Sequence, residues 1–311
     1  MTLRFAVLLA ALLLALPTMA HAREFFVDSR EGSDLGPGTR ETPWRSLARV
    51  SRARLEPGDR VLFRRGRVFR GTLRPGSSGT TERPIIYAAY GRGEMPSLRA
   101  TRPLDDPWDW VRDGGELWHA PGIAGTPGPA ALNGCAGRER SSPDALKRTG
   151  DYHLDAARAR LYMRCPVNPA EREAEVAEED FVIGPVEADH LVFSGLDLRL
   201  ARTTVFQGWG GLGLVLRNCR LLFARDNLVQ HNNHGGELRL TGCLLAEWNL
   251  GNKRAYAVQA IDNSGPLDIE GCRFEHNIPG GIFNFSGADP FIDRCTFLAN
   301  IAPPLRPGVG V

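Results

Sequence analysis

Several side chains that can move protons or hold anions cluster in the second half of the chain. A general base beside a fixed cation can remove a proton from a carbon next to a carboxylate, because the cation stabilises the developing enolate. Two carboxylates can instead share acid and base roles in a hydrolysis. The candidate catalytic residues are Lys253, His231, His234, Asp262 and Asp226. The candidate binding residues are Arg254, Arg225, Trp209 and His276.

Proton abstraction would need one base and one cation from these candidates. The base would be Lys253 in its neutral form, His231 or His234. The cation would be Arg254 or Arg225, whose planar guanidinium groups match the geometry of a carboxylate. The sequence does not choose among these alternatives.

Each assignment also has a simpler structural alternative. Asp226 and Asp262, the pair that hydrolysis would use, can cap loop amides. A Lys-Arg dipeptide is typical of a solvated loop, and the two histidines of HNNHGG can shape a turn. Both interpretations stay open for every candidate.

These candidates flank a repeat. From Leu196 in LVFSGLDL, the equivalent positions follow at spacings of 23, 24, 29 and 23 residues, and each of them is a cysteine. The alternation in LDIEGCRF places Leu, Ile, Cys and Phe on one side of a strand. Strands of successive units lie about 4.8 Å apart, so the cysteines predict an internal stack of reduced thiols, with disulfides as the alternative. The aligned cysteines are Cys219, Cys243, Cys272 and Cys295.

A second short strand follows each cysteine strand, in TVFQ, NLVQ, YAVQ and GIFN. Several short strands in each unit favour a parallel β-helix over a leucine-rich repeat. Each segment ends in an amide, which predicts a hydrogen-bonded ladder along the coil, with substrate contact as the alternative. The amides are Gln207, Gln230, Gln259 and Asn284.

The first 22 residues are typical of an export signal. They contain an early arginine, an apolar run over residues 5–16, and Ala20-His21-Ala22 as a cleavage site. A membrane anchor is the alternative, but Pro17 interrupts the short apolar run. We expect an exported protein, periplasmic or extracellular, that has no membrane span after signal removal.

The charge pattern excludes an obvious nucleic-acid-binding protein. The formal net charge is +2, which shows no basic footprint over the whole chain. The stretch RVLFRRGRVFR could attract an acidic polysaccharide, but alternating arginines are more typical of the solvated face of strands.

The N-terminal part carries a family resemblance. FFVDSREGSDLGPGTRETPWRSLARV, PGDRVLFRRGRVFRGTL and SGTTERPIIYAAYGRG resemble the pectate-lyase-like superfamily of secreted right-handed parallel β-helix proteins over residues 25–98. The resemblance implies an all-β, right-handed parallel β-helix with a polysaccharide-related role. TPWRSLARVSRA predicts a helix with Thr42 as N-cap and Pro43 in its first turn, able to cover the open end of the solenoid.

Residues 100–178 break the period and predict a small β-rich insertion. GDYHLDAARARLYMRCP predicts two strands around a tight turn, with Tyr152, Leu154, Leu161 and Met163 facing one side. The expected organisation is a signal peptide at 1–22, an N-terminal cap with the first β-helix turns at 23–99, the insertion at 100–178, and β-helix repeats at 179–311.

The insertion contains three tryptophans and two cysteines whose roles the sequence leaves open. Trp108, Trp110 and Trp118 could stack on sugar rings, but we expect them to form the core of the insertion. Cys135 and Cys165 could pair with each other in an exported chain.

The resemblance implies that carbohydrate lies across one parallel sheet, between loops that enter and leave its strands. If the amide-bearing strands form that sheet, the candidate bases and cations flank it, and EWNLGNKRAY lengthens one entering loop. We therefore expect a polysaccharide-active lyase that cleaves a uronate-containing glycan by β-elimination. The alternatives are a glycoside hydrolase and a non-catalytic glycan-binding or envelope scaffold protein. The expected partner is a polysaccharide, and the expected state is a monomer.

No cofactor is assigned, and calcium is left open. The family's calcium-dependent lyases gather several aspartates, whereas DSREGSD has only part of a calcium loop. The spacing of His231 and His234 does not make a zinc site without further ligands. The aspartate series of polygalacturonase-type hydrolases and the local signatures of the best-known pectate lyases are also missing from the sequence.

Overall fold

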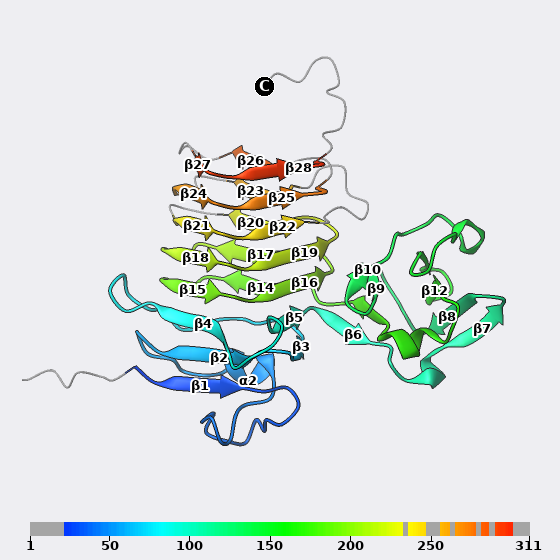
Figure 1. The fold of residues 1–311 in the computed structure, drawn as a ribbon, viewed down its shortest axis with the longest axis horizontal. Coiled ribbons are helices and arrows are strands. Elements are labelled where there is room, and N and C mark those ends of the chain that lie inside the picture. Colours follow the sequence, from blue (N-terminus) through cyan, green and yellow to red (C-terminus); the bar gives the residue numbers. More distant parts are fainter. Residues whose placement is uncertain are drawn as a thin grey trace, which may run out of the picture.

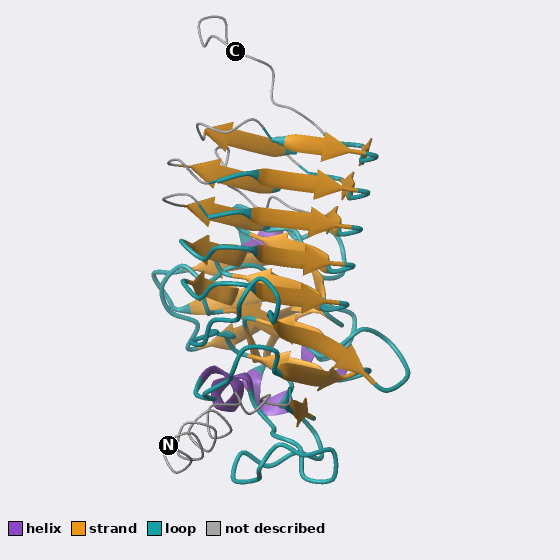
Figure 2. Cartoon of the chain, turned by 90° about the vertical axis from the view of Figure 1, so that its left-hand side faces the viewer, coloured by secondary structure: helices purple, strands orange, loops and turns teal. Residues whose placement is uncertain are grey.

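A computed structural model describes residues 22–232, 236–246, 256–261, 265–277, 281–285 and 290–300, with side chains placed for all of them except 283–285. The expected signal peptide lies outside these residues, apart from Ala22. The described chain winds into a right-handed parallel β-solenoid with little helix (Figure 1). Figure 2 shows its coils stacked as successive layers along one axis. The predicted all-β parallel β-helix is therefore confirmed.

Three parallel sheets, called A, B and C, form the walls of the solenoid. Sheet A contains, in spatial order, β1 (Glu24–Val27), β2 (Arg60–Arg64), β4 (Ile85–Tyr90), β15 (Leu191–Ser194), β18 (Leu214–Arg217), β21 (Leu238–Thr241), β24 (Leu267–Glu270) and β27 (Phe291–Asp293). Sheet B contains β3 (Val68–Arg70), β5 (Ser97–Arg99), β16 (Asp197–Ala201), β19 (Arg220–Ala224), β22 (Leu244–Ala246), β25 (Arg273–Glu275) and β28 (Thr296–Leu298). Sheet C contains β14 (Phe181–Val186), β17 (Thr204–Trp209), β20 (Val229–Asn232), β23 (Val258–Ile261) and β26 (Ile282–Phe285).

Each regular coil runs from sheet A to sheet B and then to sheet C. The turn from A to B places one residue in the left-handed backbone region, as at Gly195 (φ 66°), Asn218 (φ 52°) and Gly242 (φ 62°). Glycine and asparagine adopt this conformation at least cost, which explains why they precede the repeated position. The turn then directs the next side chain into the core.

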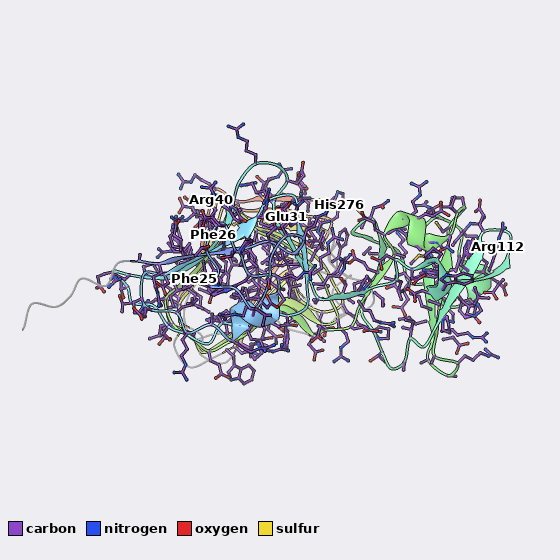
Figure 3. The ribbon with its side chains drawn as sticks, turned by 90° about the horizontal axis from the view of Figure 1, so that it is seen from below. Phe25, Phe26, Glu31, Arg40, Arg112 and His276 are labelled. Carbon is purple, nitrogen blue, oxygen red and sulfur yellow. The ribbon has the colours of Figure 1, made fainter. Side chains whose placement is uncertain are left out.

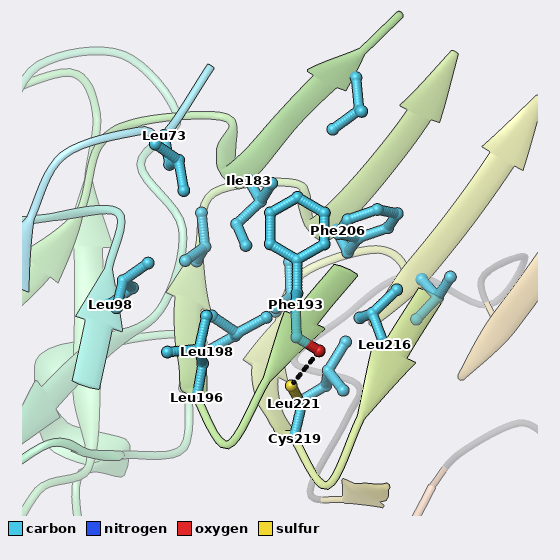
Figure 4. Packing of buried hydrophobic residues seen from close by; sticks show 14 of the residues in the cluster. Leu73, Leu98, Ile183, Phe193, Leu196, Leu198, Phe206, Leu216, Cys219 and Leu221 are labelled. Atoms are coloured by element: carbon cyan, nitrogen blue, oxygen red, sulfur yellow. Dashed lines mark hydrogen bonds between the residues drawn. The ribbon is translucent and has the colours of Figure 1, made fainter. Parts of the chain in front are cut away.

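The predicted cysteine stack is confirmed, and its thiols are free. Cys219, Cys243 and Cys272 are buried and Cys295 is partly buried. The backbone N–H of Cys243 donates to Sγ of Cys272 at 3.4 Å, and Figure 4 shows the Cys219 thiol donating to the carbonyl of Phe193 at 3.5 Å. Hydrogen bonding with Cys243 and burial raise the pKa of the Cys272 thiol far above its usual value. The stack therefore acts as small apolar packing in the core.

The N-terminal helix is shorter than predicted. Helix α2 (Leu47–Ser51) begins after Ser46, whose side chain accepts a hydrogen bond from the backbone of Arg49. The expected start at Thr42 is wrong, because Trp44 forms an extended bridge with Val27 of β1. The apolar side chains of α2 are buried as expected. The role of this segment as a cap stays a prediction.

The insertion leaves the solenoid between β5 and β14 and forms two antiparallel sheets, D and E. Sheet D contains β10 (Cys135–Ala136), β9 (Ala130–Leu132), β13 (Glu175–Ala177) and β6 (Thr101–Pro103). Sheet E contains β11 (Tyr152–Asp155), β12 (Arg160–Arg164), β8 (Leu117–Pro121) and β7 (Val111–Gly114). Short 3₁₀ turns connect them: η1 (Pro107–Asp109), η2 (Pro143–Ala145) and η3 (Pro169–Arg172). The predicted hairpin is confirmed by the antiparallel pairing of β11 with β12.

The insertion packs in layers against the outer face of sheet B (Figure 1). Ala131 of sheet D contacts Leu200, Leu222 and Phe223 of the solenoid. The opposite face of sheet D shares an apolar core with sheet E, which includes Leu161. Figure 3, which looks at the solenoid from its N-terminal end, shows the insertion projecting to one side.

Two expectations for the insertion need correction. Trp110 is buried and Trp118 partly buried, but Trp108 is 92% exposed on η1 and does not belong to the core. Cys135 is exposed and Cys165 is buried, and both thiols are free, so the structure contains no disulfide between them. Trp108 lies within η1, where the side chain of Asp106 accepts a hydrogen bond from its backbone N–H. Trp110, at the end of η1, is the tryptophan that enters the core.

Candidate functional site

The two faces of sheet C have different chemistry. Val229 and His231 of β20 are buried in the solenoid, whereas Gln230 and Asn232 alternate with them and are partly exposed. The parallel register places Gln207, Gln230 and Gln259 in one row. Trp209, Asn232 and Ile261 form a second row, two residues further along the strands. These two rows cover the outer face of the three central strands.

The predicted amide series is confirmed for three members and wrong for the fourth. Asn284 lies opposite Ala260, and Phe283 takes the place opposite Gln259. Aligning GIFN with YAVQ on their final amides is wrong by one residue. The strands pair through Ile282 and Val258, and this pairing sets the register.

The glutamines do not form a simple ladder with one another. Nε2 of Gln207 donates to the carbonyl of Gly208 at 3.1 Å, and Nδ2 of Asn227 donates to Oε1 of Gln259 at 2.8 Å. Gln207 is 4% exposed because Gly184 of β14 packs closely against it. Gln230 and Gln259 therefore present more of their surface than Gln207 does.

Trp209 and Asn232 form the most conspicuous polar–aromatic pair on this face. They are register partners at the ends of β17 and β20, and Trp209 is 52% exposed. Within the described residues, the Oδ1 atom of Asn232 is buried and accepts no hydrogen bond. The pair therefore offers an exposed ring for stacking beside a partly exposed amide side chain.

His231 lies inside the solenoid and not on the outer face. It is 1% exposed, and its Nε2 donates to the carbonyl of Gly236 at 2.9 Å. A Cβ atom on Gly208, its register partner, would come within 2.5 Å of Nδ1. Burial lowers the pKa of His231 and keeps the ring neutral. A polymer on the outer face cannot reach this side chain.

Three candidates lie at the corner where sheet B leads into sheet C. The Nη1 atom of Arg225 donates to the carbonyl of Pro127 at 3.0 Å and so holds the insertion against the solenoid. Asp226 is partly buried, and its backbone N–H donates to Thr203. His276 is exposed with φ 53°, on the side of the solenoid that faces the insertion (Figure 3).

The other candidates lie outside the described residues. Lys253 and Arg254 precede β23 in the chain, and His234 follows β20. Asp226 precedes β20 whereas Ile261, the residue before Asp262, ends β23. The pairing of Asp226 with Asp262 stays a prediction, because Asp262 lies outside the described residues.

The basic stretch at residues 60–70 is largely neutralised by acids. Arg64 and Arg67 both pair with Asp28 at 3.0 Å, and Arg60 pairs with Glu24 at 2.9 Å. The carboxylate of Asp28 is thus engaged by arginines, and a calcium ion would have to displace them. Among the described residues, no group of three or more His, Cys, Asp or Glu side chains could hold a metal ion. The described residues therefore do not fit a calcium site.

Sequence reasoning missed a buried charge cluster between the insertion and sheet B. Arg70, Arg99 and Arg199 are register partners on β3, β5 and β16. Glu175 of the insertion is fully buried and accepts from Nη1 of Arg99 at 2.5 Å, while Asp197 pairs with Arg199. The only sequence signal was an arginine at the same place in three sheet B strands, which becomes visible once the register is known.

Comparison with known proteins identifies the fold. The chain matches XylC in complex with xylose (TM-score 0.56, 13% identity, 88% of this chain and 65% of that chain). It matches a glycoside hydrolase (TM-score 0.60, 12% identity, 82% and 73%) and pectate lyase Pel9A (TM-score 0.50, 15% identity, 87% and 52%). The chain thus spans between about half and three quarters of the length of these structures.

No family model matches the sequence, and a search of curated proteins finds no match. The structural matches show that the chain has the pectate-lyase-like parallel β-helix fold that its N-terminal sequence resembles. Within the described part of the chain, no helix is long and apolar enough to cross a membrane.

Proposed function

We propose that this protein is exported and binds a polysaccharide along the outer face of sheet C. The observation that carries the proposal is the register pair of Trp209, which is half exposed, and Asn232, which is partly exposed at the end of β20. A pyranose ring can stack on the exposed indole while the partly exposed side chain of Asn232 hydrogen-bonds one of its hydroxyl groups. Gln230 and Gln259 extend the polar surface along neighbouring coils. Structures of the same fold that are named as a glycoside hydrolase and a pectate lyase support a carbohydrate ligand.

We infer further that the glycan contains uronate and that the protein cleaves it by β-elimination. A base removes the C5 proton, the electron pair forms the C4–C5 double bond, and the C4–oxygen bond breaks; the departing oxygen takes a proton from water and becomes the hydroxyl of a new chain end. His231 is too deeply buried for this task, which leaves Lys253 or His234 as the base. Arg254 would neutralise the uronate carboxylate, since Arg225 already bonds the insertion.

A non-catalytic glycan-binding protein is the second candidate, and one observation favours it. The two outer rows of sheet C, from Gln207 to Gln259 and from Trp209 to Ile261, contain amides, indole and aliphatic groups but no titratable side chain. Such a surface can hold sugar hydroxyl groups without any proton transfer. Turnover therefore decides between the two candidates.

The test incubates the mature protein with polygalacturonate and with alginate, with calcium and with chelator, and follows ultraviolet absorbance of unsaturated products. An eliminating enzyme gains absorbance, and Lys253→Ala or His234→Ala abolishes it while binding persists. Trp209→Ala should weaken binding by roughly tenfold, the effect of losing one stacking contact. Trp108→Ala is the matched control, because that tryptophan is exposed but lies on the insertion.

Flat absorbance and flat reducing-sugar release, with binding that depends on Trp209, would select the non-catalytic candidate. Unchanged binding in Trp209→Ala and in Asn232→Ala would overturn the placement of the glycan on sheet C.

A further inference from the structure

Sheet E has a second face that the solenoid does not use. Leu161 and Met163 are fully buried and point toward the core shared with sheet D. His153, Tyr162 and His119 lie opposite one another on β11, β12 and β8; His153 and Tyr162 are partly exposed, whereas His119 is 7% exposed. Since sheet D lies between sheet E and the solenoid, these three rings occupy the outermost layer of the insertion.

The three rings form one continuous strip. The ring centroids of His119 and Tyr162 are 5.6 Å apart, and those of His153 and Tyr162 are 6.2 Å apart with planes 30° from parallel. The Nδ1 atom of His119 bonds the carboxylate of Asp113 at 2.8 Å, and Nδ1 of His153 donates to the carbonyl of Arg140 at 2.8 Å. Both imidazoles are therefore held in place before any ligand arrives, which reduces the entropy cost of binding.

Positive charge flanks the central ring of the strip. Arg160 and Arg164 lie two residues on either side of Tyr162 on the same strand, so they share its face. Nη1 of Arg160 lies 3.4 Å from the hydroxyl of Tyr162, and within the described residues Arg160 forms no ion pair. Asp155, its register partner on β11, is already bound by Arg158 at 2.8 Å.

The second arginine, Arg164, also donates from Nη1 to the carbonyl of Leu146, at a long 3.4 Å. Arg164 pairs with Glu116 at 2.8 Å, but both side chains are about two-fifths exposed, at 39% and 43%. Exposed pairs of this kind contribute little, so an anionic ligand can compete for the guanidinium. The strip therefore combines ring faces with cations, which suits a ligand that has both flat apolar faces and carboxylates.

We propose that the outer face of sheet E is a second binding site for an acidic polysaccharide, separate from sheet C. A sugar ring lies against Tyr162 and His153, which are both partly exposed, and its carboxylate pairs with Arg160. The acidic class of the glycan rests on the proposed function, whereas the site itself rests on the geometry of sheet E. Two sites on one chain increase the affinity for long polymers through effective concentration, with little effect on short oligosaccharides.

The test measures retardation of the native protein in gels that contain polygalacturonate, and repeats it with polygalacturonate whose carboxyl groups have been reduced. Tyr162→Ala and Arg160→Gln should each weaken binding to the acidic polymer by roughly five- to tenfold, and the reduced polymer should bind weakly to every variant. Trp209→Ala reports separately on sheet C, and combining it with Tyr162→Ala should multiply the two losses. Trp108→Ala is the control within the insertion, and circular dichroism checks that each variant is folded.

The outcomes separate the two proposals. If Tyr162→Ala and Arg160→Gln bind like the wild type while Trp209→Ala is weak, sheet E is not a site and the proposed function stands. If the sheet E variants are weak and Trp209→Ala is normal, sheet E is the site and the placement on sheet C fails. Equal retardation of the acidic and reduced polymers would refute the role of Arg160, and a wild type that binds neither polymer would overturn both proposals.

Discussion

A buried carboxylate, Glu175, contributes to the contact between the insertion and the solenoid, and Glu175→Gln tests how much. Glu175 is fully buried, accepts from Nη1 of Arg99 at 2.5 Å and from Oγ1 of Thr101 at 2.7 Å, and lies 3.4 Å from Nε of Arg70. Glutamine keeps the size of the side chain but removes its charge. The substitution therefore probes the electrostatics of the interface with little change in packing.

The expected loss follows from the charges around the site. Arg70, Arg99 and Arg199 are neighbours in register, and the carboxylates that face them are Glu175 and Asp197. Without the charge of Glu175, three cations are left with one anion, and the side chains of Arg99 and Arg199 are only 9% and 10% exposed. Breaking one side of a buried ion pair costs about 3–5 kcal/mol, because the remaining charge is buried without compensation.

Glu178→Gln on the same segment is the matched control. Glu178 pairs with Arg102 at 2.8 Å, but both side chains are 40% exposed, so its loss should cost about 1 kcal/mol or less. The double variant Arg99→Met with Glu175→Leu removes both charges, and it should be less destabilised than Glu175→Gln alone.

Urea denaturation followed by tryptophan fluorescence measures these differences, and hydrogen exchange reports directly on the amides of sheet D. Glu175→Gln should lower the denaturation midpoint far more than Glu178→Gln and should speed exchange in β13. Equal midpoints for the two variants would refute the reasoning, since the buried and exposed carboxylates would then contribute alike.

Two further predictions concern buried groups of the solenoid and exposed groups of the insertion. Burial lowers the pKa of His231 below 6.5, so the unfolded chain binds the extra proton and stability falls as the pH drops below about 6.5. In urea denaturation between about pH 7.5 and 5.5, His231→Gln should reduce the slope of unfolding free energy against pH. An unchanged slope would contradict the prediction. A thiol reagent with mass spectrometry should modify Cys135 first, Cys295 more slowly and the buried cysteines only after unfolding, whereas an unreactive Cys135 would indicate a disulfide.

Local sequence patterns were enough to predict the parts of the fold that repeat. The spacing of Cys219, Cys243 and Cys272 predicted an internal stack, because alternation along a strand and a turn residue before each cysteine are local properties. The hairpin of the insertion was predicted for the same reason, since its two strands are neighbours in the chain. Local patterns were less reliable at the ends of elements, as the late start of helix α2 at Leu47 shows.

The candidate site was predicted only in part. The glutamines at 207, 230 and 259 were placed correctly in one row, but Asn284 was placed one residue out of register. His231 appeared as an accessible base in the sequence and is buried in the structure, because the glycine opposite it leaves room for an inward imidazole. The pairing of Trp209 with Asn232 at the ends of β17 and β20 had no signal in the sequence at all.

The sequence by itself determined that the chain coils with a period of about two dozen residues and which positions of each strand are apolar. Only the tertiary structure decided that the insertion covers sheet B and that Glu175 meets Arg99 from 76 residues away. The physical reason is that a strand pattern specifies which side chains share a face. What that face contacts depends on register and on layers brought together from distant parts of the chain.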